Sequence, residues 1–211
     1  MRPEDQLNAG VGYTVIPRVL VFLTRDDEVL LLRGAADKKL WAGKYNGLGG
    51  HIEPGETPHQ AAVREVEEEA GLTVDVLTLR AIIHVTLASA PGVPFGFAHG
   101  VPSGFAHGVL FFVFTGTTPP GELRASNEGA PVWVARSDVA NLPLVEDLPE
   151  LLPRVLEAGP LIYGNYTFSA GRLQMTFESP ANSRIPNVAA RASSSANSRS
   201  VAGKRPCSGE S

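Results

Sequence analysis

Cysteine is almost absent from this sequence, since Cys207 is the only one among 211 residues. A single cysteine excludes an internal disulfide framework and a zinc site built on several thiolates. No apolar run approaches the ~18 residues that a membrane-spanning helix needs. Near the N-terminus, Glu4 and Asp5 stand where an export signal would carry an apolar core. These absences predict a reduced, cytoplasmic protein without a membrane partner.

Aromatic residues make up only 7% of the chain and charged residues 19%, whereas hydrophobic residues reach 43%. That hydrophobic share is typical of globular proteins and excludes a chain that is disordered throughout. The formal net charge is −4, although residues 179–211 carry five basic residues against the single acid Glu210. The negative charge is therefore concentrated in residues 1–178, which disfavours strong nucleic-acid binding.

The last stretch of the chain, residues 179–211, is rich in serine, alanine and arginine and has no aromatic residue. Such a segment buries too little apolar surface to offset the entropy that ordering costs. We therefore expect a disordered tail at 179–211 and a folded domain at 1–178. Within the domain, residues 93–100 and 101–108 read VPFGFAHG and VPSGFAHG. We interpret this duplication as a lengthened loop between two strands.

The order of the predicted elements indicates a fold of mixed α and β type. Runs rich in β-branched and aromatic residues predict strands, and two longer runs with helical spacing predict helices. Strands are expected at residues 13–23, 29–32, 72–87, 109–115, 132–134, 161–168 and 172–177, and helices at 57–70 and 148–158. The first two strands are expected to form a hairpin around residues 26–28.

The first of these helices carries its own start and stop signals. Thr57 can cap the helix, Pro58 suits the first helical position, and Gln60 stands where a capping box places its returning side chain. Gly71 suits the cap at the C-terminal end. These signals predict a helix over residues 57–70.

Three carboxylates of this helix, Glu65, Glu68 and Glu69, stand at i, i+3 and i+4 and share one face. Like charges at this spacing repel each other, and Arg64 is the only cation in the helix. One interpretation is an acidic face in contact with solvent. The other is a divalent cation such as Mg²⁺, which prefers oxygen ligands and commonly joins carboxylates to phosphates. The glycine-rich residues 47–50 just upstream allow the backbone to approach a ligand closely.

A longer pattern decides between these interpretations. It consists of Gly50, five residues, Glu56, seven residues, Arg64-Glu65-Val66, one residue, Glu68-Glu69, one residue and Gly71-Leu72. In this pattern the chain resembles the Nudix hydrolase family at every fixed position. Residues 42–50, 128–133 and 163–166 are also similar to the MutT-like enzymes that hydrolyse oxidised purine nucleoside triphosphates. The resemblance implies an α/β Nudix fold, in which a mixed β-sheet is sandwiched between helices (α/β/α).

The resemblance also implies roles for individual residues. The implied cofactor is Mg²⁺, with Mn²⁺ as the alternative ion. Its implied ligands are Glu65, Glu68, Glu69, Glu128 and the backbone carbonyl of Gly49. Either Glu65 or Glu69 would accept the proton of the attacking water. Arg64, paired with Glu56, would support the catalytic carboxylates.

Four further residues are candidates for binding the substrate. Asn46 matches an asparagine that contacts the purine base, although it also suits a turn before a glycine. Glu146 and Asp147 fall near an acidic pair that reads the base in the animal enzyme. Arg33 is either a phosphate ligand or a surface arginine at the end of a strand.

The implied reaction is Mg²⁺-dependent hydrolysis of a nucleoside triphosphate to a monophosphate and pyrophosphate, with 8-oxo-dGTP or a related purine nucleotide as substrate. One alternative is an ADP-ribose or nucleotide-sugar pyrophosphatase, and another is a non-catalytic Nudix module that binds nucleotides. The expected partner is a small nucleotide, and the chain is expected to be a monomer or a homodimer.

Overall fold

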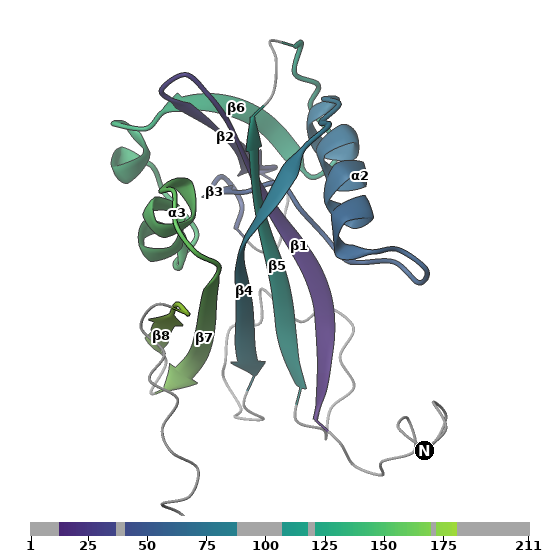
Figure 1. Cartoon of the computed structure of the whole chain (residues 1–211). Coiled ribbons are helices and arrows are strands. Elements are labelled where there is room, and N and C mark those ends of the chain that lie inside the picture. Colours follow the sequence, from purple (N-terminus) through teal and green to yellow (C-terminus); the bar gives the residue numbers. More distant parts are fainter. Residues whose placement is uncertain (1–12, 37–40, 88–106, 118–120, 170–171, 181–211) are drawn as a thin grey trace, which may run out of the picture. The chain divides into compact units, whose positions relative to one another are not determined.

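The computed structural model describes residues 13–36, 41–87, 107–117, 121–169 and 172–180 (Figure 1). The expected tail from residue 181 onward lies outside these ranges, as do residues 93–106 of the duplicated octets. The described elements are β1 (Thr14–Arg25), β2 (Glu28–Gly34), β3 (Tyr45–Asn46), α2 (Pro58–Ala70), β4 (Leu77–Leu87), β5 (His107–Thr117), β6 (Gly129–Ala135), a 3-10 turn (Val139–Asn141), α3 (Leu148–Leu156), β7 (Ile162–Ser169) and β8 (Arg172–Glu178). None of the helices in these ranges has the length and apolar character required to cross a membrane.

The strands form one sheet in the order β3-β2-β1-β5-β4-β7-β8, and β6 also pairs with β2. β1 runs parallel to β5, and β4 runs parallel to β7. The other pairs, among them the β1–β2 and β7–β8 hairpins, are antiparallel. The sheet is therefore mixed, as the resemblance implied.

Both faces of the central strands are buried, which explains the continuous apolar run of β1. Val19, Val21 and Leu23 belong to the apolar cluster that includes residues of α2. Leu20 and Phe22 face the opposite way, into the cluster that includes residues of α3. Successive residues of a strand point to opposite faces, so one strand serves both clusters. Figure 1 shows α2 and α3 on opposite sides of β1, β4 and β5.

Helix α2 begins and ends as its sequence predicts. The hydroxyl of Thr57 accepts a hydrogen bond from the Gln60 amide at 3.2 Å, and the Gln60 side chain accepts one from the Thr57 amide at 2.9 Å. Pro58 occupies the first turn, and Gly71 closes the helix with a left-handed φ of 70°. The predicted capping box and glycine cap are therefore both confirmed.

The other boundaries differ from the prediction where contacts between distant segments decide them. The short strand β3 was not predicted, because two residues carry no periodicity. Helix α3 ends at Leu156 rather than 158. The Arg80 guanidinium donates hydrogen bonds to the backbone carbonyls of Val155, Glu157 and Gly159. A side chain from β4 thus satisfies carbonyls at the end of α3, a role that only the folded sheet reveals.

Candidate active site

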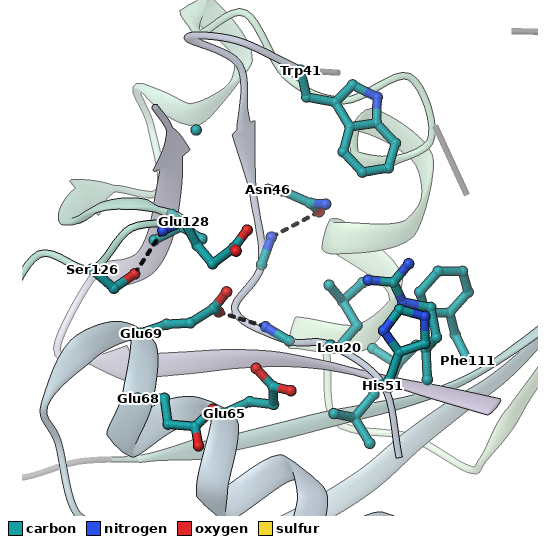
Figure 2. Close-up of a pocket in the computed structure, with 18 of the residues that line it drawn as sticks. Leu20, Trp41, Asn46, His51, Glu65, Glu68, Glu69, Phe111, Ser126 and Glu128 are labelled. Atoms are coloured by element: carbon teal, nitrogen blue, oxygen red, sulfur yellow. Dashed lines mark hydrogen bonds between the residues drawn. The ribbon is translucent and has the colours of Figure 1, made fainter. Parts of the chain in front are cut away.

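A pocket of about 700 Å³ brings together residues from β1, β2, β3, α2, the loop before β6 and the start of α3. Its acidic end is formed by Glu65, Glu68, Glu69 and Glu128. Figure 2 shows these carboxylates on one side, with the rings of Trp41 and Phe111 on the other. The pocket is therefore polarised between an acidic end and a partly aromatic end.

The double glycine of the signature is required by close contacts at the acidic end. The Gly50 carbonyl accepts a hydrogen bond from the Val19 amide at 2.9 Å, which holds this loop against β1. Gly49 has a φ of 148°, and a Cβ atom there would lie 2.2 Å from the Val19 carbonyl oxygen. A Cβ atom on Gly50 would lie 2.2 Å from Oε1 of Glu65. Only glycines let the loop pass between β1 and the α2 carboxylates.

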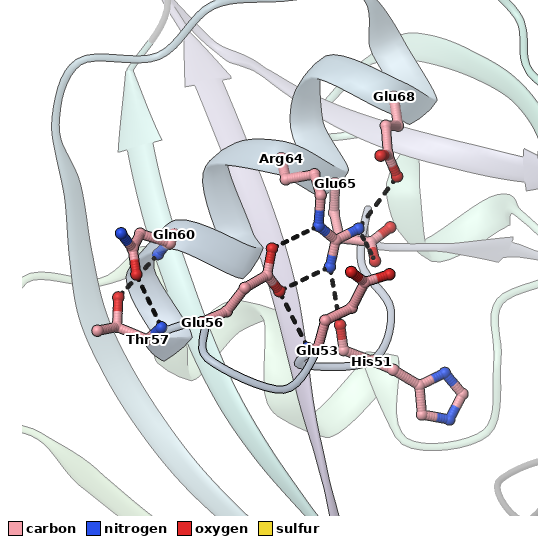
Figure 3. A network of polar contacts seen from close by, with 8 residues as sticks. All are labelled: His51, Glu53, Glu56, Thr57, Gln60, Arg64, Glu65 and Glu68. Carbon is pink, nitrogen blue, oxygen red and sulfur yellow. Dashed lines mark hydrogen bonds and ion pairs between the residues drawn. The ribbon is translucent and has the colours of Figure 1, made fainter.

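Arg64 organises the carboxylates around the start of α2 (Figure 3). Its guanidinium donates to both oxygens of Glu56, at 2.7 and 3.0 Å, which confirms the predicted pair. The same group donates to Glu65 at 2.9 Å and to Glu68 at 3.1 Å. It also donates to the His51 carbonyl at 3.0 Å. The hydrogen bonds from Arg64 hold the pKa of Glu56 below its ordinary value.

Glu69 lies deeper than the other carboxylates, with only 4% of its surface exposed. Its Oε2 accepts a hydrogen bond from the Gly49 amide at 2.8 Å. Burial raises the pKa of Glu69 and the charges of Glu65 and Glu128 add to this, whereas the hydrogen bond from Gly49 opposes it; together they bring the pKa to about 8. Burial also raises the pKa of Glu65. The negative charges of this cluster are therefore costly unless a cation neutralises them.

The chemistry of this cluster fits a hard divalent cation, because it presents several carboxylate oxygens to one pocket. Glu65, Glu68, Glu69, Glu128 and Gly49 all line the same pocket. Within the described ranges, however, no three acidic or histidine side chains already stand at metal-binding distances. Arg64 holds Glu65 and Glu68 on one side.

Asn46 and Asp147, which are a hundred residues apart, meet in this pocket. Backbone hydrogen bonds join their segments, since Tyr45 donates to the Pro143 carbonyl and accepts from the Val145 amide. The Asn46 side-chain oxygen accepts from the Gly47 amide at 2.8 Å, which leaves its NH₂ group to donate to a ligand. Asp147 is buried at the start of α3. These two predicted base contacts are therefore placed together.

The other two predicted substrate contacts lie elsewhere. Arg33 is exposed and does not line the pocket, whereas its neighbours Leu32 and Gly34 do. Since residues alternate along a strand, Arg33 points away from the face that carries the pocket. Glu146 forms an ion pair with Lys44 and is also absent from the pocket lining. The structure does not support direct substrate contacts by Arg33 and Glu146, and both remain predictions.

A model of the NUDIX domain matches residues 15–155, which is most of the described chain. The chain belongs to the NUDIX domain family. The MutT protein of Bacillus halodurans has the same fold, with a TM-score of 0.62, 23% identity, and coverage of 78% of this chain and 98% of that one. The predicted Nudix fold is therefore confirmed.

Two curated Nudix relatives match a shorter segment. The oxidized purine nucleoside triphosphate hydrolase of Danio rerio is 50% identical over 58 residues, which are 28% of this chain and 36% of that protein. The NAD-capped RNA hydrolase NudC of Stutzerimonas stutzeri is 41% identical over 58 residues, which are 28% of this chain and 20% of that protein. The match thus spans about a third or less of each relative.

Arg18 and Trp41 are among the pocket residues of this Nudix domain that were not predicted from the sequence. Arg18, on β1, lines the pocket beside the carboxylates, and Trp41 lines the opposite end. The available signals were weak, because Arg18 is a lone cation before the apolar run at residues 19–23 and Trp41 is a lone aromatic before the glycine-rich loop. Neither signal shows which face of the fold the side chain reaches.

Asp147 makes the stability of the Nudix domain depend on pH. Burial raises its pKa from 3.8 to about 6. Between these two values the folded state holds a proton that the unfolded state releases, so the free energy of unfolding falls as pH rises. At neutral pH we expect Asp147→Asn to raise that free energy by about 1 to 3 kcal/mol.

Urea denaturation of the metal-free protein at several pH values tests this expectation. The stability gap between Asp147→Asn and the parent protein should widen between about pH 4 and about pH 7. The matched control is Asp138→Asn, since Asp138 is exposed outside the pocket. A gap that stays constant over this range contradicts the assignment.

Proposed function

We propose that this Nudix domain hydrolyses a purine nucleoside triphosphate to a monophosphate and pyrophosphate, with Mg²⁺ or Mn²⁺ as cofactor. The observation that carries the proposal is one pocket that has the carboxylates of α2 and Glu128 at one end, the rings of Trp41 and Phe111 at the other, and Asn46 and Asp147 in its lining. A nucleotide has the same polarity, with phosphates at one end and a base at the other. The name of the Danio rerio relative supports the choice of substrate class.

The carboxylates of α2 supply the hydrolytic chemistry in this proposal. A divalent cation held by Glu65, Glu68, Glu69, Glu128 and the Gly49 carbonyl would neutralise the charge that develops on the phosphate. Glu65 or Glu69 accepts the proton of the attacking water at a carboxylate oxygen. In Glu69 this oxygen is Oε1, since Oε2 already accepts from the Gly49 amide. Arg64 positions Glu65 and Glu68 through its hydrogen bonds to their carboxylates.

The opposite end of the pocket binds the base. Trp41, Leu20 and Phe111 supply apolar and aromatic surface against which a purine ring can pack. The NH₂ group of Asn46 donates a hydrogen bond to an acceptor on the base edge. The carboxyl of Asp147 accepts a hydrogen bond when ionised and can also donate one when protonated. Such groups distinguish bases, because a mismatched base leaves a buried polar group without a partner.

Replacing Asn46 with aspartate tests this base contact. The variant keeps the acceptor for the Gly47 amide but loses the NH₂ donor, so the local turn should survive. We expect kcat/KM for purine nucleoside triphosphates to fall about tenfold, as loss of one good hydrogen bond predicts. The matched control is Asn141→Asp, on the exposed 3-10 turn. An unchanged kcat/KM for every purine substrate contradicts the contact.

A substrate screen with Mg²⁺, with Mn²⁺ and with a chelator tests the proposed function as a whole. It compares 8-oxo-dGTP, the ordinary nucleoside triphosphates, ADP-ribose, nucleotide sugars and NAD-capped RNA, and it identifies the products. Preference for a purine triphosphate with release of pyrophosphate supports the proposal. Preference for ADP-ribose, a nucleotide sugar or capped RNA supports the proposed hydrolytic site but contradicts the proposed substrate. If none of these compounds is hydrolysed, the result favours a non-catalytic module that binds nucleotides.

A further inference from the structure

Arg18 is a cation of the pocket that the proposed chemistry leaves without a role. It lies on β1 opposite His51, to which its backbone is bridged, and its side chain is partly buried. Its Nε is fully buried and has no hydrogen-bond partner among the described residues. Buried polar groups in native proteins are nearly always paired, so the unpaired Nε shows that the described part of the protein does not hold this guanidinium by hydrogen bonds there. Because the Arg18 side chain lines the pocket, a ligand in the pocket can meet its terminal N–H groups.

The nearby carboxylates do not supply that partner. Glu65 is bonded to Arg64, and Glu69 is bonded to the Gly49 amide. Within the described part of the chain, no carboxylate lies at ion-pair distance from Arg18. Burial lowers the pKa of Arg18, and the charges of Glu65, Glu69 and Glu128 partly offset this effect through space. Arg18 is thus a counter-charge near the acidic cluster but not a member of its hydrogen-bond network.

A phosphate group is the ligand that matches this position. A guanidinium donates two parallel N–H groups that fit a pair of phosphate oxygens, and such charged hydrogen bonds are strong. Arg18 lines the pocket together with Leu20 of the apolar end, which lies two residues further along β1, and the charges of the carboxylates at the acidic end act on it. A phosphate between these two ends would therefore meet Arg18 next to the cation-binding carboxylates.

We propose that Arg18 binds a phosphate group of the nucleotide and thereby positions the phosphate chain against the carboxylates of α2. This inference rests on the proposed nucleotide substrate and adds one contact to it. It assigns to Arg18 the phosphate-binding role that the sequence suggested for Arg33. Arg33 is exposed and lies outside the pocket lining. Replacing Arg18 should therefore weaken phosphate binding, whereas replacing Arg33 should not.

Calorimetric titration of the full-length protein with Mg²⁺ tests the inference without requiring turnover. The probes are dGMP and deoxyguanosine, which differ only in the phosphate. We expect Arg18→Gln to weaken dGMP binding about 10- to 100-fold, as loss of a charged hydrogen bond predicts, and to leave deoxyguanosine binding unchanged. Arg18→Lys keeps the positive charge but lacks the two parallel N–H groups of the guanidinium, so it should bind dGMP with intermediate affinity.

The matched control is Arg172→Gln, which removes an exposed arginine of β8 outside the pocket and should bind dGMP normally. Unchanged dGMP binding by Arg18→Gln overturns the inference. So does an equal loss of dGMP and deoxyguanosine, because that pattern indicates a structural role, and so does a wild-type protein that binds no dGMP. If Arg18→Gln does not fold by circular dichroism, wild-type dGMP affinity in Arg18→Lys overturns the inference instead.

Hydrolysis measured on the same preparations separates this inference from the proposed function. Turnover of a nucleotide by wild-type protein, combined with unchanged dGMP binding by Arg18→Gln, overturns the role of Arg18 and leaves the function standing. Phosphate-dependent binding through Arg18 without turnover of any nucleotide supports the phosphate site and overturns the hydrolytic function.

Discussion

Glu69→Gln is expected to lower kcat on the order of 100-fold or more, because it removes a charged oxygen from the proposed cation site. The glutamine keeps the side-chain length and can still accept a hydrogen bond from the Gly49 amide. The loop should therefore stay in place while the charge is lost. Since burial raises the pKa of Glu69 to about 8, the variant should also be more stable than the parent protein in the absence of metal.

Two measurements check this result on the same samples, namely turnover with Mg²⁺ and the melting temperature with and without Mg²⁺. The parent protein should gain more stability from Mg²⁺ than Glu69→Gln does, because binding to the folded state stabilises it. Glu67→Gln is the matched control, since Glu67 lies on the same helix but is exposed and outside the pocket. If Glu69→Gln turns over substrate at nearly the rate of the parent protein, the assignment of Glu69 to the active site is contradicted.

Gly49→Ala is expected to destabilise the domain by about 3 kcal/mol or more, since it combines backbone strain with a clash. The φ of 148° is rarely adopted by residues with a Cβ atom, and that atom would meet the Val19 carbonyl oxygen at 2.2 Å. The obstructing atom belongs to the backbone of a central strand and cannot move aside without disturbing the sheet. Urea denaturation of the variant and the parent protein measures the loss.

Gly50→Ala provides the comparison, because its Cβ atom meets the end of the Glu65 side chain rather than backbone. A flexible side chain can rotate away, so this variant should lose less stability than Gly49→Ala. It should nevertheless lose activity, since the Glu65 carboxylate is displaced. Equal stabilities of the two alanine variants would contradict the distinction between backbone and side-chain contacts.

The parts of this fold that the sequence predicted well are those decided by neighbours along the chain. Thr57, Gln60 and Gly71 define the limits of α2 because each acts within one turn of the helix end. The hairpin between β1 and β2 is likewise local, with Asp26 at a positive φ of 46° in its turn. In the site, Arg64 and Glu56 were predictable as a pair because they belong to one uninterrupted motif.

The parts that the sequence missed depend on register between distant segments. Arg18 enters the pocket because β1 lies against the loop that carries His51, and nothing local fixes that pairing. Arg33 was the more natural candidate from sequence, since it ends an apolar strand close to the motif. Alternation along a strand predicts that neighbours face opposite ways but does not predict which face holds the pocket. Arg18 and Arg33 are distinguished only once the sheet is assembled.

The backbone connection between β3 and the segment before α3 has a consequence for how such a pocket can diversify. Tyr45 is joined to Pro143 and Val145 through main-chain atoms alone, so any side chains that preserve the backbone also preserve the connection. The distance between positions 46 and 147 should therefore stay the same when the residues at these positions change. If Asn46 and Asp147 bind the base as proposed, new base preferences are expected to arise by single substitutions at these two positions without any change in helix α2.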